Sequence, residues 1–176
     1  MKASLFIVSA VYGISCHAAL GTRDTSGLKL SDIYGAIETD PQGFVHIGDD
    51  GVLRSYGRDE KVVDYARLSP EQLKRAIDSW PNKDEHAHLN EVWDGIDGRD
   101  VPHTEALDPP VHLKPRAAGI SPNSPDREAT EVVKQLENRQ VVCLNIDCKT
   151  TESCQAMGCP VCGALDSMVK KICLMA

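Results

Sequence analysis

Six cysteines crowd the end of this chain, and thiols at such density form disulfides, bind a metal or carry out redox chemistry. The chain has 176 residues and seven cysteines. In an oxidising compartment, a short cysteine-dense stretch is typical of a disulfide framework, although the spacing does not fix the pairing. The sequence therefore predicts disulfides among Cys143, Cys148, Cys154, Cys159, Cys162 and Cys173.

Zinc binding and redox catalysis are the alternatives for the same stretch. Tetrahedral zinc sites usually take two CxxC pairs, whereas only Cys159 and Cys162 have that spacing here. A redox CxxC requires a strand before it and a helix after it, but Gly158 indicates a turn before this pair. Neither pattern is complete, so we expect no cofactor.

A second group of reactive side chains lies in DEHAHLNEVWDGIDGRDVPH, which is rich in acids and histidines. On a helix His88 and Glu91 share a face, but His86 points elsewhere. The set His86, His88 and Glu91 is a weak metal-site alternative, because it lacks the HExxH spacing. The favoured interpretation is a solvated acidic helix end. No GxSxG elbow or glycine-rich phosphate loop is present, so we expect no catalytic residue and no enzyme.

The first 18 residues have the features of a secretory signal peptide. Lys2 precedes a short apolar run, and Ala18 is placed for cleavage. Cleavage there removes Cys16, the odd cysteine, and leaves six that can pair. No later segment is apolar enough for a membrane span. The sequence thus predicts a secreted, extracellular protein.

The net charge of -7 gives no basic face for phosphates, which argues against nucleic-acid binding. The expected partner is an extracellular protein or surface ligand, whose identity the sequence does not reveal.

The elements that would hold these residues begin with an antiparallel meander over 33–67. The segments IYGAIE, FVHI, VLRSY and KVVDYARL are rich in strand formers and are separated by turn sequences. Asp40-Pro41-Gln42-Gly43 is one such turn.

Two helices are expected next, over 70–80 and 83–94. Ser69, Pro70 and Gln72 form a capping-box start, and Pro81 ends the first helix. With the meander they complete a core over 19–100.

The rest of the chain divides into a proline-rich linker over 101–124 and a C-terminal module over 125–176. The module consists of a helix over about 125–138 and the six cysteines. Arg116 in the linker is a weak candidate for proteolytic processing. The fold class is therefore α+β: an antiparallel meander with packed helices, followed by a small disulfide-rich module.

The chain resembles the small secreted cysteine-rich proteins of filamentous ascomycete fungi, many of them candidate effectors. The likeness lies in VHIGDDGVLRSYGRDEKVVDYARLSPEQL, in VWDGIDGRDV and in the tail C-x4-C-x5-C-x4-C-x2-C. It implies a fungal origin and an extracellular role, and it transfers no catalytic residue.

Together these patterns favour a secreted, non-enzymatic, effector-like binding protein that acts outside the fungal cell. Two alternatives remain: a precursor that releases a cysteine-rich toxin or antimicrobial peptide near Arg116, and a metal-dependent hydrolase using the His86 to His103 stretch.

Overall fold

A computed structural model describes residues 25–115, 143, 146–166 and 171–174. The expected signal peptide with Ala18, the processing candidate Arg116 and the helix expected over 125–138 lie outside these residues.

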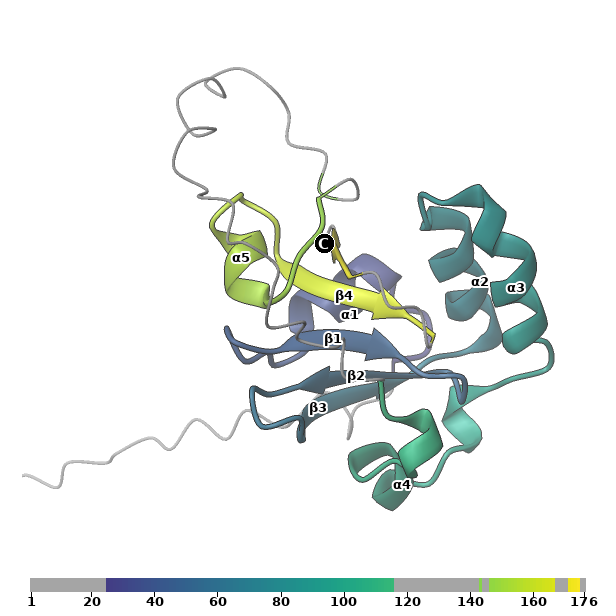
Figure 1. The fold of residues 1–176 in the computed structure, drawn as a ribbon. Helices are drawn as coiled ribbons and strands as arrows, with labels where there is room; N and C mark the ends of the chain where they lie inside the picture. The colour runs from purple at the N-terminus through teal and green to yellow at the C-terminus, as the bar shows by residue number, and fades with distance from the viewer. Residues whose placement is uncertain (1–24, 116–142, 144–145, 167–170, 175–176) are drawn as a thin grey trace, which may run out of the picture.

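The described residues form one five-stranded sheet with helices on both faces, in the order β3-β2-β1-β4-β5 (Figure 1). The first three strands make the predicted antiparallel meander, whereas β4 runs parallel to β1 and antiparallel to β5. The α+β class with a C-terminal group of disulfides is confirmed. The strands are β1 (Phe44–Ile47), β2 (Val52–Tyr56), β3 (Val62–Arg67), β4 (Val161–Leu165) and β5 (Ile172–Leu174).

The meander begins later than predicted, because the first expected strand is a helix. Helix α1 (Leu30–Ala36) covers most of the segment IYGAIE. Leu30, Ile33, Tyr34 and Ile37 recur at helical spacing, and all four are buried. This apolar stripe packs in the core, and its burial outweighs the strand propensity of isoleucine and tyrosine.

The first predicted helix is confirmed. Helix α2 (Pro70–Ser79) has the expected capping box between Ser69 and Gln72. The second predicted helix, over 83–94, is a short 3-10 turn η2 (Lys83–Glu85) followed by α3 (His86–Val92).

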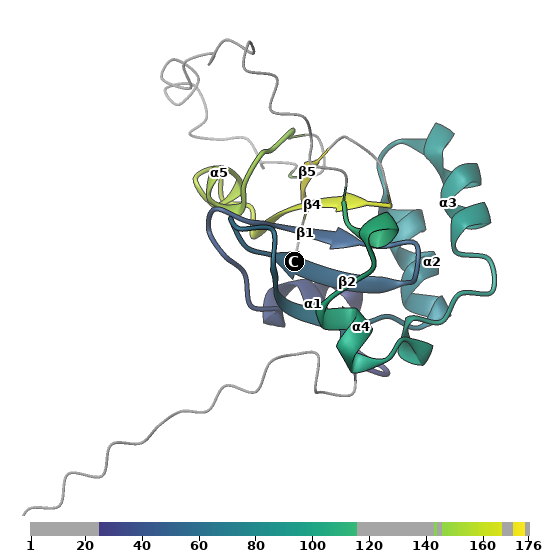
Figure 2. The same ribbon diagram turned by 60° about the horizontal axis from the view of Figure 1, so that its bottom comes forward.

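One face of the sheet carries the main core. Helices α1 and α2 cover this face, with α3 beside α2 (Figures 1 and 2). Leu73 of α2 and Leu89 of α3 are fully buried there, and Trp80 and Trp93 are buried as well. The aromatic residues therefore pack in the core as large apolar groups.

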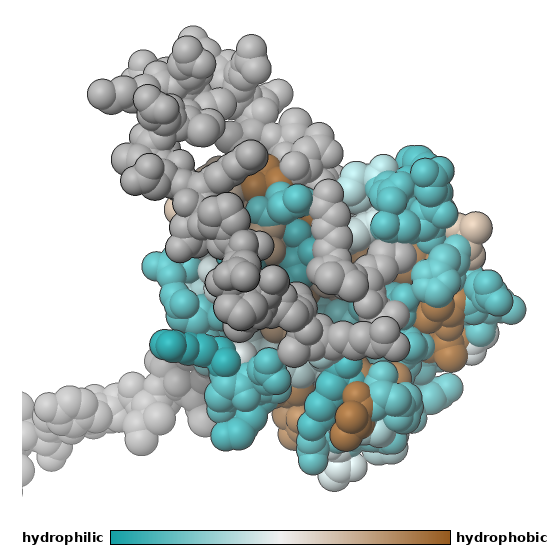
Figure 3. All heavy atoms as spheres, viewed as in Figure 1, coloured by the Kyte–Doolittle hydropathy of each residue, from teal (hydrophilic) through white to brown (hydrophobic). Residues whose placement is uncertain are grey.

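The opposite face is covered in part by residues expected to be linker. After η3 (Gly98–Asp100), at the end of the expected core, the linker residues form α4 (His103–Leu107) and η4 (Val111–Leu113). Ala106 packs on Val52 and Tyr65, which explains why this proline-rich stretch is ordered against the sheet. Apolar residues reach the surface around α4 (Figure 3), where Leu107 is 50% exposed.

Strand β4 joins the cysteine-rich end of the chain to the meander. Val161, Leu165, Ile172 and Leu174 all lie in the main core with α1 and α2. The residues expected to form a separate C-terminal module thus complete the sheet. Among the described residues, no helix has the length and apolar character needed to cross a membrane.

Candidate functional site

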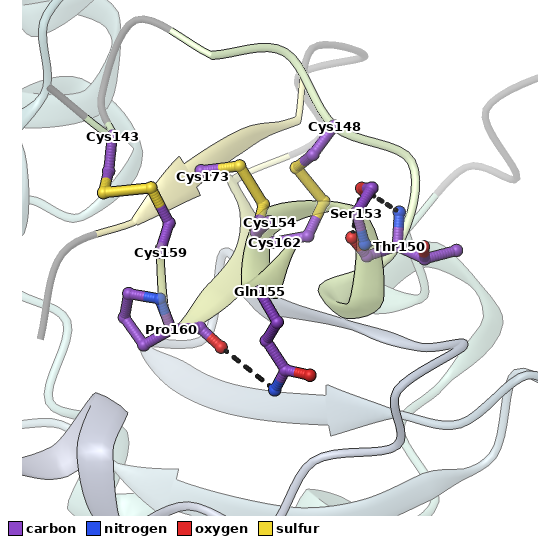
Figure 4. The surroundings of a disulfide bond; sticks show 10 residues. All are labelled: Cys143, Cys148, Thr150, Ser153, Cys154, Gln155, Cys159, Pro160, Cys162 and Cys173. Atoms are coloured by element: carbon purple, nitrogen blue, oxygen red, sulfur yellow. Dashed lines mark hydrogen bonds between the residues drawn. A yellow bond between two sulfur atoms is a disulfide. The ribbon is translucent and has the colours of Figure 1, made fainter. Parts of the chain in front are cut away.

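The six C-terminal cysteines form the three predicted disulfides, and the structure supplies the pairing that their spacing did not determine. The pairs are Cys143–Cys159, Cys148–Cys162 and Cys154–Cys173 (Figure 4).

Two of the three disulfides involve cysteines on a helix or a strand. Helix α5 (Thr151–Gln155) begins with a capping box between Thr150 and Ser153, and it carries Cys154 into the interior. Cys162 and Cys173 lie on β4 and β5 and are fully buried. Burial shields these sulfur atoms from external reductants, which favours a permanent structural role.

Metal binding by these cysteines is blocked by their bonding. Within the described ranges, Cys148, Cys154 and Cys173 are the one group of ligand-type side chains whose ligand atoms lie close enough to hold an ion. All three are in disulfides. A zinc ligand must be a thiolate, so these sulfur atoms are unavailable.

The disulfide-bearing segment docks on the meander through backbone hydrogen bonds. The Thr151 amide donates to the Gly43 carbonyl at 2.8 Å, and the Glu152 amide donates to the Pro41 carbonyl at 2.7 Å. Lys171 adds a cation–π contact, with its ammonium 3.2 Å from the centre of the Phe44 ring.

The second candidate set, His86, His88 and Glu91, does not come together. The His86 ring nitrogen Nε2 bonds to the Trp80 carbonyl at 2.8 Å, whereas His88 Nε2 lies 2.8 Å from Asp166 Oδ2. Glu91 is exposed. The cause is helix geometry, since residues two apart lie on opposite sides of a helix.

Asp166, which the sequence did not single out, is the centre of a different cluster. It follows β4 with a left-handed φ of 50° and is 2% exposed. Its amide donates to the Ile47 carbonyl at 2.9 Å, and its own carbonyl bonds to His46 Nε2. Its side chain bonds to His88 and Asp49. We call Asp49, Asp166, His46 and His88 the Asp166 cluster.

Two carboxyl groups of this cluster, those of Asp49 and Asp166, are hydrogen-bonded to each other. The hydrogen bond to Asp166 and burial raise the pKa of Asp49 to about 7, and the nearby charges of Asp166 and Asp50 add to the shift. Two adjacent carboxylates cannot both ionise without strong repulsion. Near neutral pH, Asp49 therefore changes between a neutral hydrogen-bond donor and a second negative charge.

The cluster contains the buried His46 and lies beside a buried ion pair. Burial lowers the pKa of His46 to about 4, so its ring is neutral in neutral solution. Its register partner Arg54 is fully buried and pairs with Asp50, at 2.6 Å between Nη2 and Oδ2. Arg54 Nε also donates to the Ala106 carbonyl at 2.9 Å, which fixes α4 on the sheet.

Strand order alone would predict that polar residues gather at this edge of the sheet, but the sequence does not show which residues meet there. Asp49 lies two residues after the end of β1 and Asp166 directly follows β4, and the two strands are parallel neighbours. In open α/β sheets, ligands and polar groups gather beyond such carboxyl ends. No pattern in the sequence indicated that β4 would lie beside β1.

The chain matches no known protein-family profile. It is 32% identical over 170 residues to the "Lactobacillus up-regulated protein" of Emericella nidulans, and the match covers 95% of this chain and 94% of that protein. The chain belongs to the family of this fungal protein. No solved structure matches it.

Membership of the Lactobacillus up-regulated protein family extends over both parts of the fold. A match over 95% of the chain takes in the meander as well as the cysteine-rich end. The match to a protein of Emericella nidulans agrees with the fungal origin that the resemblance implied. The disulfide-bearing strands and the sheet that they complete are thus aligned together with a fungal relative of nearly the same length.

Proposed function

We propose that the protein is secreted by a fungus and acts outside the cell as a non-enzymatic, effector-like binding protein. The observation that carries the proposal is the set of three disulfides at the C-terminal end, with Cys154, Cys162 and Cys173 fully buried. Stable structural disulfides form in the secretory pathway and persist outside the cell, whereas the cytosol keeps thiols reduced. The expected signal peptide ending at Ala18 provides the route.

The relative's name suggests the kind of partner. That protein is called up-regulated in connection with Lactobacillus. We carry this to the present chain as a proposal that its ligand lies on the surface of a competing bacterium.

Neither alternative has comparable support. A released C-terminal peptide would take β4 and β5 away from β1, and with them Val161 and Leu165 of the main core. A metal-dependent hydrolase would need His86, His88 and Glu91 to converge, and their contacts point in different directions.

Secretion is tested by expressing the full chain in a filamentous fungus and determining the mass and N-terminus of the product. We expect a protein in the medium that begins at Ala19, ends at Ala176 and contains no free thiol. The control variant Ile7→Arg breaks the apolar run of the signal peptide and is expected to stay in the cell. Retention of the unchanged protein inside the cell with reduced cysteines would contradict the proposal.

Binding is tested by mixing the purified, oxidised protein with intact lactobacilli and measuring how much sediments with the cells. We expect saturable binding that reduced and alkylated protein does not show. Degradation of the cell surface that is lost in His88→Ala would point to an enzyme and overturn the non-enzymatic proposal.

A further inference from the structure

The Asp166 cluster joins three elements that are distant in the sequence. Asp49 belongs to the turn between β1 and β2, His88 belongs to α3, and Asp166 directly follows β4. The carboxyl group of Asp166 contacts both other side chains, at 2.8 Å in the case of His88. The protonation state of Asp49 therefore influences how the β1–β2 turn, helix α3 and the end of β4 are held together.

Helix α3 has a second attachment beside the cluster. The indole Nε1 of Trp93 donates to the carbonyl of Gly48 at 3.0 Å. Gly48 directly precedes Asp49, so the same turn receives the end of α3. A shift of this turn is consequently transmitted to the helix, and Trp93 reports on it.

The charges around Asp49 favour its neutral form. Asp166 and Asp50 face it with negative charge, and His88 faces it from α3. Asp50 is neutralised by Arg54. His46 contacts the Asp166 carbonyl from β1 and is buried in its neutral form. Ionisation of Asp49 thus adds a negative charge beside the carboxyl group of Asp166.

We propose that the Asp166 cluster is a proton-operated latch, in which a proton shared by Asp49 and Asp166 holds α3 and the β1–β2 turn against the end of β4, and its loss releases them. The latch is closed in acidic solution and opens as the solution becomes neutral to mildly alkaline. It is a property of the fold, and it holds whether the protein acts by binding or otherwise.

The sign follows from the titration of Asp49. Its pKa in the folded protein, about 7, lies above the ordinary value. The stabilisation is therefore complete below about pH 4 and is lost as the pH rises through about 7. Asp49 is partly exposed, so solvent screening reduces the effect. The unscreened effect would be about tenfold between pH 6 and pH 8, so we expect opening to become about fivefold more frequent.

The experiment measures amide hydrogen exchange and the indole resonances of the oxidised protein from pH 5 to pH 8.5. Protection factors, corrected for the intrinsic pH dependence of exchange, should fall about fivefold in α3 between pH 6 and pH 8, while those in α2 stay constant. The Trp93 indole resonance should move with a midpoint near pH 7.

The diagnostic variant is Asp49→Asn, because an amide donates to Asp166 at every pH. It should abolish both the loss of protection and the Trp93 transition. The matched control Asp59→Asn changes an exposed aspartate in the next turn, which bonds to Lys61, and should leave both unchanged.

Three results would overturn the latch. One is an unchanged transition in Asp49→Asn. Another is a uniform loss of protection in α2 and α3, which would indicate global unfolding. The third needs only the unmodified protein, namely a Trp93 indole resonance that does not move near pH 7.

Discussion

Cys162 and Cys173 lie directly opposite each other on β4 and β5, yet they are not bonded to each other. Cys162 pairs with Cys148, and Cys173 pairs with Cys154 of α5. The strand pair is thus held together by its backbone hydrogen bonds, while the two disulfides attach it to the segment that precedes β4 in sequence. This arrangement ties helix α5 to the sheet, and it makes the buried disulfides part of the main fold.

The Cys154–Cys173 disulfide is expected to contribute most to stability. The double variant Cys154→Ala/Cys173→Ala should lower the free energy of unfolding by about 3 kcal/mol, because this bridge closes a loop with a sequence separation of 19 and both cysteines are fully buried. The measurement is urea unfolding followed by tryptophan fluorescence. Cys143→Ala/Cys159→Ala is the matched control, with a separation of 16 and with Cys143 buried but 7% exposed. A larger loss in the control would contradict this ranking.

The ion pair between Arg54 and Asp50 is expected to respond asymmetrically to mutation. Asp50→Ala should cost about 3–5 kcal/mol, because it leaves a fully buried guanidinium without its negative partner. Arg54→Met should cost less, about 1–2 kcal/mol, since methionine fills much of the space and Asp50 keeps 12% of its side chain exposed. Thermal and urea unfolding of both variants measure the difference.

The exposed pair of Asp59 and Lys61 is the control for this comparison. Their side chains are 60% and 82% exposed, so Asp59→Ala should leave stability unchanged. Equal losses in Asp50→Ala and Arg54→Met would show that burial of the unpaired charge is not the cause.

His46 is expected to make the protein sensitive to acid. Its pKa of about 4 in the folded state lies below the ordinary value, so its stabilising contribution is present above about pH 6.5 and is lost as the pH falls through about 4. The loss should approach about 3 kcal/mol and should disappear in His46→Gln.

The pH dependence of unfolding by urea between pH 3 and pH 7 tests this. The comparison is best made in the Asp49→Asn background, because Asp49 acts with the opposite sign in the same range. His112→Gln, at an exposed histidine, is the control and should keep the acid sensitivity. An unchanged slope in His46→Gln would refute the assignment.

After a single proteolytic cut between residues 116 and 142, the two fragments are expected to stay bound to each other. All three disulfides lie on the C-terminal side of such a cut, so only non-covalent contacts join the two chains. The pairing of β1 with β4 and the shared core should hold them together at concentrations of about 1 μM. With an engineered protease site, size exclusion measures this directly. A C-terminal chain that elutes alone would favour the released-peptide alternative.

Local sequence patterns predicted several elements correctly, because short-range interactions decide them. The capping box of Ser69 and Gln72 starts α2 where expected, and the β-hairpin turns separate β1, β2 and β3. The prediction of a strand for the segment IYGAIE was wrong because it relied on these short-range preferences alone. Its residues favour strands in isolation, whereas the buried side of α1 is formed only when Ile33 and Tyr34 meet the core.

The sequence by itself determined that six cysteines crowd the C-terminal end and that a meander and a capped helix precede them. Only the tertiary structure decided their partners. His88 and Asp166 are 78 residues apart, and His46 and Asp166 are 120 apart. No local periodicity links such positions. They meet because β4 buries its apolar side chains beside β1. This burial is favourable only when all the helices and strands that form the main core are in place.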